Sequence, residues 1–205
     1  MRHGCTSIRV PRLKASKPTS DVIVEAAEAL FAERGFAGVS LRQIIAAAGV
    51  STTAFYARFE SKAAVLDALG AQFFAELQAD AGRVLGASRS LADGIERGVD
   101  LVCEKLGPRK ALVRLIIAES GSLAPTIASR KNAYAMLAAF LAHRFTALAE
   151  RGRIRARDPN ALAWALVGAL EIQIVRWAVW NELDLAMLRD ALIATAYAIL
   201  PEEIR

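Results

Sequence analysis

Helical spacing of apolar residues runs through almost the whole chain, and this feature restricts the fold most strongly. In the first clear segment Ile23, Ala27, Leu30 and Phe31 recur at the three- and four-residue spacing of one helix face. Similar segments follow, and clusters of Gly, Pro, Ser and Asn separate them. No stretch keeps the alternation of apolar and polar residues that a half-buried strand needs. The sequence therefore predicts an all-α protein.

The breaks between segments predict about nine helices in total. Pro18, Thr19, Ser20 and Asp21 supply start signals, including hydroxyl groups able to cap, for a helix that ends at Gly35. The next three are expected from Leu41 to Gly49, from Ser51 to about Arg58, and from Ser61 to about Arg83. The later helices are expected near residues 91–106, 109–119, 124–150, 159–181 and 184–200.

The chain has 205 residues, of which 55% are hydrophobic, so it can bury a core without disulfides or metals. Its most apolar late segment, Ala161 to Val179, contains Glu171 and Arg176, and the N-terminus lacks the apolar stretch of a secretory signal. We therefore expect no membrane contact and a cytoplasmic location. The two cysteines and two histidines form no cluster, so no disulfide framework, metal site or cofactor is expected.

The net charge of +5 comes from the N-terminal tail. Residues 1–20 carry five basic residues and no acidic one, whereas the other 21 basic residues are balanced by 21 acidic ones. A basic segment without periodic apolar residues is expected to be flexible alone and attracted to polyanions. It is an arm that contacts a polyanion such as DNA, a tail that only aids solubility, or the result of a wrongly chosen start.

Residues 41–58 have the layout of two short helices joined by a tight turn. Gly49 supplies the left-handed backbone that the turn needs, and Ser40 with Gln43 forms a capping box for the first helix. This arrangement is typical of a helix-turn-helix, which reads DNA with its second helix. The residues expected at the N-terminal tip of that second helix are small: Ser51, Thr52, Thr53 and Ala54.

Two further side chains are placed to reach DNA phosphates. Tyr56 lies one turn along the second helix, and Lys62 starts the helix that follows. Each has a plainer interpretation, because Tyr56 can be a half-buried packing residue and Lys62 a solvated charge. From Thr19 to Lys62 four basic residues stand against five acidic ones, so DNA binding must rely on local placement, the arm and a dimer's doubled contacts.

Several motifs occur here in a specific order: Ala26-Ala27, Leu30-Phe31, Arg34-Gly35-Phe36, Val39-Ser40, Ile44, Ala48-Gly49-Val50-Ser51, Phe55-Tyr56, Phe59 and Ser61-Lys62. With these motifs, the span from Ser20 to about Gly70 resembles the DNA-binding domain of TetR-family transcriptional regulators. Gly152 to Arg155 followed by Asp158-Pro159 is similar to a junction before the family's last two helices. The resemblance implies an N-terminal three-helix helix-turn-helix domain, followed by a larger helical bundle for ligand binding and dimerisation.

The resemblance also implies roles for individual residues. The implied DNA contacts are Ser40, Arg42, Ser51, Thr52, Thr53, Ala54, Tyr56, Arg58 and Lys62. Two positions depart from the family's pattern. Ile45 stands where members usually have Ala, so we expect a slightly altered crossing of the two helices. Thr53 stands where many members carry Gly, Pro or Arg, so the operator sequence cannot be inferred from relatives.

In the family the last two helices of each subunit form a four-helix interface, and both apolar helices after residue 159 suit this role. The expected dimer contacts are Ala161, Ala165, Gly168, Ile172, Leu185, Leu188, Leu192 and Ala196. Small residues at helical spacing let helices approach closely. Helices that are apolar on two sides can also be the central members of a wholly intramolecular bundle.

A ligand pocket is expected inside the bundle. The expected lining residues are Tyr134, Met136, Phe140, His143, Trp164 and Glu171. Such a mixed aromatic and polar lining suits a small, largely apolar ligand, although a Met and aromatic stripe also fits an ordinary core. Glu171, isolated among apolar residues, is expected either to meet a cationic ligand or to pair with an arginine such as Arg176.

The predicted organisation is a flexible basic arm at 1–18, a helix-turn-helix domain at 19–66 with its motif at about 39–58, and a ligand-binding and dimerisation domain at 67–205. The predicted function is a ligand-responsive homodimeric repressor that binds a double-stranded DNA operator and a small hydrophobic effector. An effector-independent DNA-binding or protein-interaction module is the alternative. An enzyme is not expected, because the sequence has no paired nucleophile and base, phosphate loop or metal cluster.

Overall fold

Three short helices form a head whose helix ends follow local sequence chemistry. The computed structural model describes residues 17–119 and 124–200. The head helices are α1 (Thr19–Arg34), α2 (Leu41–Ala48) and α3 (Thr52–Tyr56). The Ser40 hydroxyl accepts a hydrogen bond from the Gln43 N–H, and the Gln43 side chain accepts one from the Ser40 N–H. This capping box starts α2, while Gly35 and Gly49, with φ of 70° and 64°, end α1 and α2.

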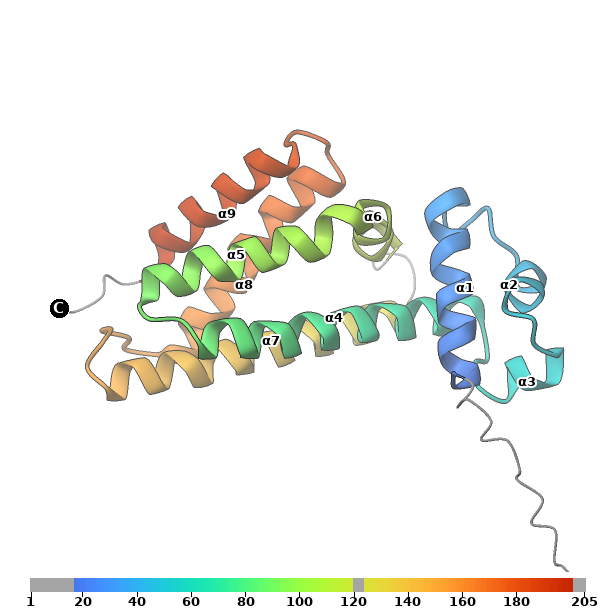
Figure 1. The fold of residues 1–205 in the computed structure, drawn as a ribbon, viewed down its shortest axis with the longest axis horizontal. Coiled ribbons are helices and arrows are strands. Elements are labelled where there is room, and N and C mark those ends of the chain that lie inside the picture. The colour runs from blue at the N-terminus through green and yellow to red at the C-terminus, as the bar shows by residue number, and fades with distance from the viewer. Residues whose placement is uncertain (1–16, 120–123, 201–205) are drawn as a thin grey trace, which may run out of the picture.

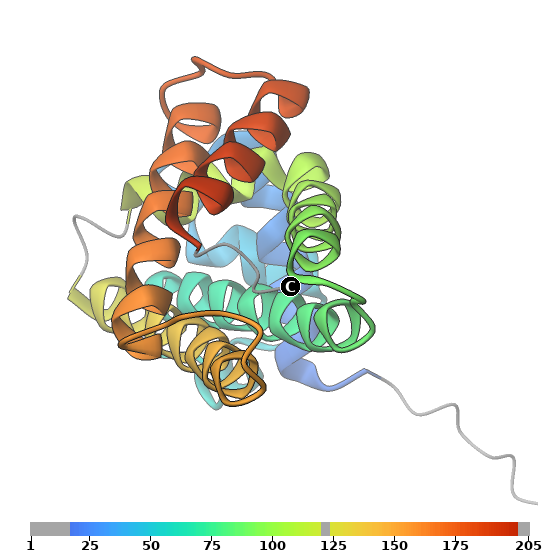
Figure 2. The same ribbon diagram turned by 90° about the vertical axis from the view of Figure 1, so that its left-hand side faces the viewer.

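The remaining helices form a body that extends away from the head (Figure 1). They are α4 (Lys62–Gly86), α5 (Leu91–Leu106), the 3-10 turn η1 (Gly107–Arg109), α6 (Lys110–Glu119), α7 (Ala124–Glu150), α8 (Pro159–Ala178) and α9 (Leu185–Ile199). The long helix α4 leaves the head and runs along the body against α5 and α7, and α8 packs on both α7 and α9. Figure 2 looks along the body and places α9 on the side opposite α4 and α7. Throughout the described ranges all regular structure is helical, which confirms the predicted all-α class.

The head and the body share a core at their junction. Ile23, Ile44 and Phe55 are fully buried in the head, and Leu112 and Leu115 of α6 belong to the same cluster of buried side chains. The short helix α6 packs against both α1 and α8. Burial of apolar surface therefore joins the head to the body through α6 as well as through the continuous helix α4.

Several helix boundaries differ from the predicted ones. No hydroxyl caps α1: its N-cap is Pro18, and the Ser20 hydroxyl instead donates to the Asp21 carboxylate at 3.1 Å. α3 ends at Tyr56, before the expected Arg58. At their C-termini α4 continues to Gly86 and α8 stops at Ala178, each a few residues from the expected end.

Residues 1–16, most of the predicted basic arm, lie outside the described residues. The predicted boundary at residue 66 falls inside α4, which continues through it without a break. Within the described part of the chain, α8 is the one helix long and apolar enough by length and composition to cross a membrane, and 28% of its most apolar window is buried. Most of this apolar window of α8 is therefore not buried within the protomer.

Candidate functional site

The head holds α2 and α3 as a helix-turn-helix. Gly49 adopts left-handed backbone, with φ of 64° and ψ of 27°, and a Cβ at this position would meet no atom within 4 Å. The backbone angle and not lack of space therefore favours glycine here. Val50 and Ile45 are half-buried and pack against the head core. Ile45, for which the sequence predicts a slightly altered helix crossing, is thus accommodated by packing in the head.

Helix α3 lies at the end of the molecule away from the body (Figure 1). The side chains at its N-terminal tip are small. The Ser51 hydroxyl caps α3 by accepting a hydrogen bond from the Ala54 N–H at 3.1 Å. Thr52 and Thr53 are exposed, and Ala54 is half-buried. This tip therefore has exposed hydroxyl groups on a helix end whose backbone N–H groups favour anions.

Exposed donors flank that tip. Tyr56 is 55% exposed, while its ring makes an edge contact with buried Phe55 at a centroid distance of 5.6 Å. The phenol is therefore accessible, and the interpretation of Tyr56 as a half-buried packing residue is wrong. Ser40, Arg42 and Arg58 are also exposed, so the predicted contact residues on α2 and after α3 are all accessible to a ligand of the head.

Lys62 has a structural role that the sequence interpretation missed. Its ammonium group donates hydrogen bonds to the carbonyl oxygens of Phe36 at 2.6 Å and Val39 at 2.7 Å. It also lies 4.2 Å from the centroid of the Phe36 ring. Both carbonyls belong to the loop between α1 and α2, so Lys62 ties this loop to the start of α4. A phosphate would compete with these bonds. The main role of Lys62 is therefore to hold the loop that positions α2.

The body contains a cavity of about 640 Å³, lined by residues from α4 to α9. Its size falls within the range of roughly 300–1,000 Å³ found for small-molecule sites. The wall is mostly apolar. Two of its polar groups meet halfway along α7, where the Tyr134 hydroxyl donates a hydrogen bond to the Glu171 carboxylate at 2.6 Å. The cavity can therefore hold a largely apolar molecule and offers it a few polar contacts.

Three of the six predicted lining residues, Tyr134, Phe140 and Glu171, lie in the cavity wall. Met136 is 47% exposed, Trp164 is 43% exposed and His143 is also exposed, and none of them lines the cavity. These three predictions are corrected by helix geometry. At about 100° per residue, Met136 lies on nearly the opposite side of α7 from Tyr134, and Trp164 projects from the outer side of α8.

The predicted pairing of Glu171 with Arg176 is also wrong. Arg176 donates to the Glu182 carboxylate at 2.8 Å and to the Gln173 side chain at 3.0 Å. Five residues along α8 correspond to a rotation of about 140° from Glu171, so the two side chains point in different directions.

The outer side of α8 carries the strip of small residues predicted for the dimer. Ala161, Ala165, Gly168 and Ile172 are all exposed, with Ile172 at 43%, and Trp164 lies among them. A Cβ added at Gly168 would meet no atom within 4 Å. Among the described residues, no contact within the protomer therefore requires glycine at this position, although glycine costs a helix interior up to about 1 kcal/mol relative to alanine.

The dimer contacts predicted on α9 need correction. Leu188, Leu192 and Ala196 are 0%, 1% and 4% exposed, so they lie in the protomer's own core and a partner cannot reach them. The most apolar side of α9 packs on α5 and α8 within the protomer, where its side chains are buried away from water. Leu185 is 41% exposed and remains accessible. The outward side of α9 instead presents Met187 at 50% and Tyr197 at 48%.

Arg109 links the head to the body and was not recognised in the sequence. Its Nε lies 3.3 Å from the Glu28 carboxylate of α1, and its Nη1 lies 3.3 Å from the Glu76 carboxylate of α4. The guanidinium also lies 5.6 Å from the centroid of the Phe73 ring, and Phe73 lines the cavity. All three partners, one on α1 and two on α4, are distant from Arg109 in the sequence, so no local spacing signals the contact.

Four arginines that line the cavity were also missed: Arg89, Arg144, Arg151 and Arg153. They come from the segment between α4 and α5, from α7, and from the segment between α7 and α8. Each is an ordinary surface charge in its own segment, and only the fold brings them to one end of the cavity.

Comparisons with known proteins agree with this geometry. Residues 23–69 match the family model described as "Bacterial regulatory proteins, tetR family". The HTH-type transcriptional regulator UidR of Escherichia coli (strain K12) is 31% identical over 146 residues, which span 68% of this chain and 70% of that protein. UidR of Shigella flexneri matches equally well.

Solved structures share the fold over most of the chain. A TetR-family regulator from Syntrophomonas wolfei superposes with a TM-score of 0.78 at 19% identity, over 88% of this chain and 93% of that one. Salmonella enterica GusR gives 0.69 at 24% identity, over 92% and 99%. Thermus thermophilus FadR, a repressor solved with lauroyl-CoA, gives 0.71 at 23% identity, over 88% and 92%. By its sequence relatives, its helix-turn-helix and its fold, this chain belongs to the TetR family of DNA-binding transcriptional regulators.

Proposed function

We propose that this regulator is a cytoplasmic homodimeric repressor whose affinity for its operator falls when a small effector occupies the body cavity. The observation that carries the proposal is the double role of α6. Leu112 and Leu115 lie in the core that holds α1, α2 and α3 together, whereas Val113, Ile116 and Ile117 of the same helix line the cavity. A ligand that shifts α6 acts directly on the packing of the head.

Arg109 provides a second connection between the same two regions. Its ion pairs with Glu28 and Glu76 join α1 to α4, and its guanidinium packs near the cavity residue Phe73. Thermus thermophilus FadR has the same fold and was solved with lauroyl-CoA, which supports a ligand role for the cavity here. The effector lowers DNA affinity only if it binds the DNA-incompetent arrangement of the heads more tightly than the competent one.

For the dimer, we propose that the outer side of α8 meets its counterpart in a second copy, with Met187 and Tyr197 of α9 beside it. Gly168 at the centre of this face lets two helices approach closely, and the exposed apolar residues around it need cover. The resulting two heads read two half-sites, which doubles the contacts of a head in which acidic residues slightly outnumber basic ones.

For the DNA contacts, we propose Thr52, Thr53 and Tyr56 in the major groove, with Ser51 and Ala54 beside them. Ser40, Arg42 and Arg58 bind DNA phosphates on either side of the groove. Lys62 holds the loop before α2 and lies near the DNA backbone. All of these residues except Ala54 and Lys62 are exposed, and this accessibility supports the assignment. An effector-independent DNA-binding module is the second candidate, but a cavity of about 640 Å³ next to α6 favours the ligand-responsive one.

The contact assignment is tested with fluorescence anisotropy on a duplex from the DNA beside the protein's own gene. Tyr56→Phe and Arg42→Ala are each expected to weaken binding by about tenfold, because each removes one polar contact from both heads. Arg97→Ala, which removes an exposed arginine of α5, is the control and should leave affinity unchanged. Wild-type affinity in both head variants would overturn the contact assignment.

Ligand responsiveness is tested separately. Compounds that raise the melting temperature of the full chain are titrated into the protein–DNA complex. A cavity ligand is expected to lower DNA affinity, and saturating DNA is expected to lower the affinity for that ligand by the same factor. A cavity ligand that leaves DNA affinity unchanged would favour the effector-independent module.

A further inference from the structure

The cavity has two chemically different parts, which restricts the class of ligand it can take. Along most of its length the wall is made of Leu, Val, Ile, Phe and Ala side chains. Its polar groups are concentrated at the end farthest from the head, where the segment between α4 and α5 meets the end of α7. The polar residues of this distal mouth are Ser88, Arg89, Ser90, Arg144, Arg151 and Arg153.

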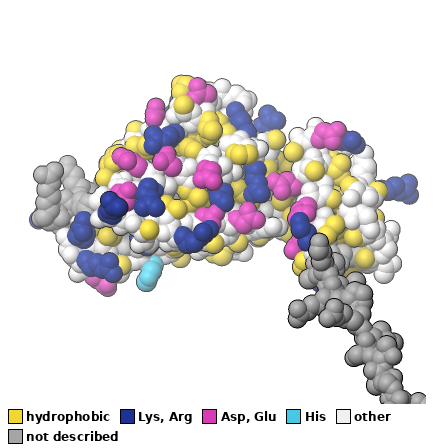
Figure 3. Space-filling view, in the orientation of Figure 1, with side chains coloured by type: hydrophobic (Ala, Val, Ile, Leu, Met, Phe, Trp, Pro, Cys, Tyr) yellow, Lys and Arg dark blue, Asp and Glu magenta, His cyan; other side chains and the backbone are white. Residues whose placement is uncertain are grey.

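The distal mouth is cationic. Among the described residues that line the cavity, four are arginines, and Glu171 is the one carboxylate. Glu171 is far from the mouth, because its partner Tyr134 precedes Arg144 by ten residues of α7, which corresponds to about 15 Å along the helix. Figure 3 shows several Lys and Arg side chains at this end of the body, with Asp and Glu side chains among them. The charge of the mouth is therefore not balanced from within the cavity.

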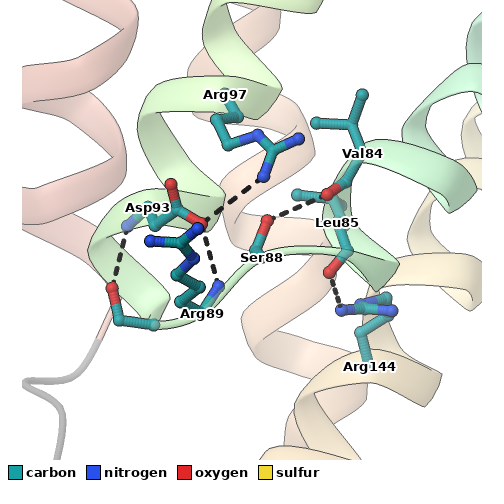
Figure 4. A network of polar contacts seen from close by, with 8 residues as sticks. Val84, Leu85, Ser88, Arg89, Asp93, Arg97 and Arg144 are labelled. Atoms are coloured by element: carbon teal, nitrogen blue, oxygen red, sulfur yellow. Dashed lines mark hydrogen bonds and ion pairs between the residues drawn. The ribbon is translucent and has the colours of Figure 1, made fainter.

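The arrangement of the mouth is fixed by contacts that leave guanidinium groups available (Figure 4). Arg144 is half-buried, and its Nη2 donates to the Leu85 carbonyl oxygen at 2.5 Å, which holds it beside the end of α4. The nearby carboxylate of Asp93 accepts from the Arg89 backbone N–H at 2.8 Å and lies 3.7 Å from Arg97 Nη1. The backbone of Arg89 is therefore held in place.

The guanidinium groups of Arg89 and Arg151 are available to bind a ligand. In the part of the chain that the structure describes, neither guanidinium makes a hydrogen bond or an ion pair, although both groups line the cavity. Guanidinium groups bind carboxylate and phosphate oxygens through paired hydrogen bonds. A neutral apolar ligand would fill the inner part and leave these groups unused.

We propose that the effector is an amphipathic anion: its apolar tail lies in the inner cavity, and its carboxylate or phosphate group is bound at the distal mouth by Arg89, Arg144 and Arg151. This inference deepens the proposed ligand response and rests on it for its biological role, but the binding site itself does not depend on DNA. The tail extends from the mouth toward α6, so an occupied cavity presses on the helix whose other side holds the head core.

The test uses the full chain and four probes with the same tail: laurate, dodecyl phosphate, dodecanol and dodecylamine, each below its aggregation concentration. Affinities are measured by calorimetry at one salt concentration. The anions are expected to bind about tenfold or more tightly than dodecanol, and dodecylamine least tightly, because charge-assisted hydrogen bonds form only with the anions. The ratio of laurate to dodecyl phosphate affinity tells which head group the mouth prefers.

Matched variants locate the head group. The double variant Arg89→Gln and Arg151→Gln is expected to weaken anion binding about tenfold and to leave dodecanol binding unchanged. The control is the double variant Arg155→Gln and Arg157→Gln, which removes the same charge from nearby exposed arginines that do not line the cavity. It should change neither anion binding nor dodecanol binding. Ala81→Phe, which adds a ring to the cavity wall, is expected to weaken binding of all four probes.

The proposal is overturned if dodecanol or dodecylamine binds as tightly as the anions, if no probe binds, or if the two double variants have the same effect. Failure of the proposed function looks different. If laurate binds in an arginine-dependent way but leaves DNA affinity unchanged, the site is correct and the ligand response is wrong. If a neutral ligand binds in the cavity and releases DNA, the ligand response is correct and the anion site is wrong.

Discussion

The ammonium group of Lys62 lies 2.6 Å from the carbonyl oxygen of Phe36 and 4.2 Å from the centroid of the Phe36 ring. One side chain at the start of α4 thus holds the backbone and the ring of the loop that leads into α2. A residue whose sequence position suggests a phosphate contact is also part of the internal structure of the head.

Lys62→Met is therefore expected to lower the free energy of unfolding by about 1–3 kcal/mol, because two half-buried carbonyl oxygens lose their donor. Arg58→Met, an exposed head residue, is the control and is expected to change stability by less than about 0.5 kcal/mol. Urea denaturation of both variants measures the difference. Equal stability of the two variants would show that the bonds of Lys62 contribute nothing to the fold.

Gly168→Glu is expected to convert the dimer to a monomer that remains folded. The added carboxylate has free space within the protomer, but in the proposed interface it would be buried without a partner. Gly86→Glu, at another helical glycine with open space around it, is the control and should stay dimeric. Sedimentation equilibrium gives both masses. A dimeric Gly168→Glu variant would place the interface elsewhere.

The two sides of α9 are expected to respond differently to truncation. Leu192→Ala removes a fully buried side chain and should lower the free energy of unfolding by about 2–5 kcal/mol at every protein concentration. Tyr197→Ala, on the exposed side, should instead weaken dimerisation, so that its melting temperature depends more strongly on concentration. Thermal unfolding at several concentrations separates the two, and the reverse pattern would contradict the assignment of the two faces.

Asp80 links α4 to α5, and its contribution to stability should depend on pH. Hydrogen bonds from Lys105, at 2.5 Å, and from Arg83 lower the pKa of the Asp80 carboxyl below its ordinary value. A lowered folded-state pKa stabilises the fold at every pH above the unfolded-state pKa, and this contribution is lost as the pH falls through the folded-state pKa.

Asp80→Asn should therefore lower the melting temperature at neutral pH, and its difference from the wild type should disappear in acid below that folded-state pKa. Glu104→Gln removes an exposed carboxylate of α5 and serves as the control, with no comparable trend. A deficit of Asp80→Asn that stays constant as the pH falls would exclude the ion pair as its cause.

The features that sequence predicted well are those set by neighbouring residues. The capping box of Ser40 and Gln43 and the left-handed Gly49 both depend on a few consecutive positions, so the start and the end of α2 could be predicted closely. The helix-turn-helix and its exposed tip followed from the same local signals.

The features that sequence missed depend on how distant elements meet. Both sides of α9 are apolar, and only packing on α5 and α8 decides that Leu188 is buried and Met187 exposed. Arg89 lies in the segment between α4 and α5, and Arg151 lies in the segment between α7 and α8. The cavity that both residues line forms only when the body folds. Spacing along one helix can assign a residue to a face but cannot tell which neighbour covers that face.

In the proposed mechanism two copies of this chain read one DNA sequence together. The most direct measurement compares binding of the wild-type protein, at one salt concentration, to a duplex from the DNA beside its own gene and to a shuffled duplex of equal length. Light scattering gives the mass of each complex. Joint reading by two heads should give complexes built from dimers and roughly a thousandfold or greater preference for the native sequence. Equal affinity for both duplexes, or one protomer per duplex, would contradict it.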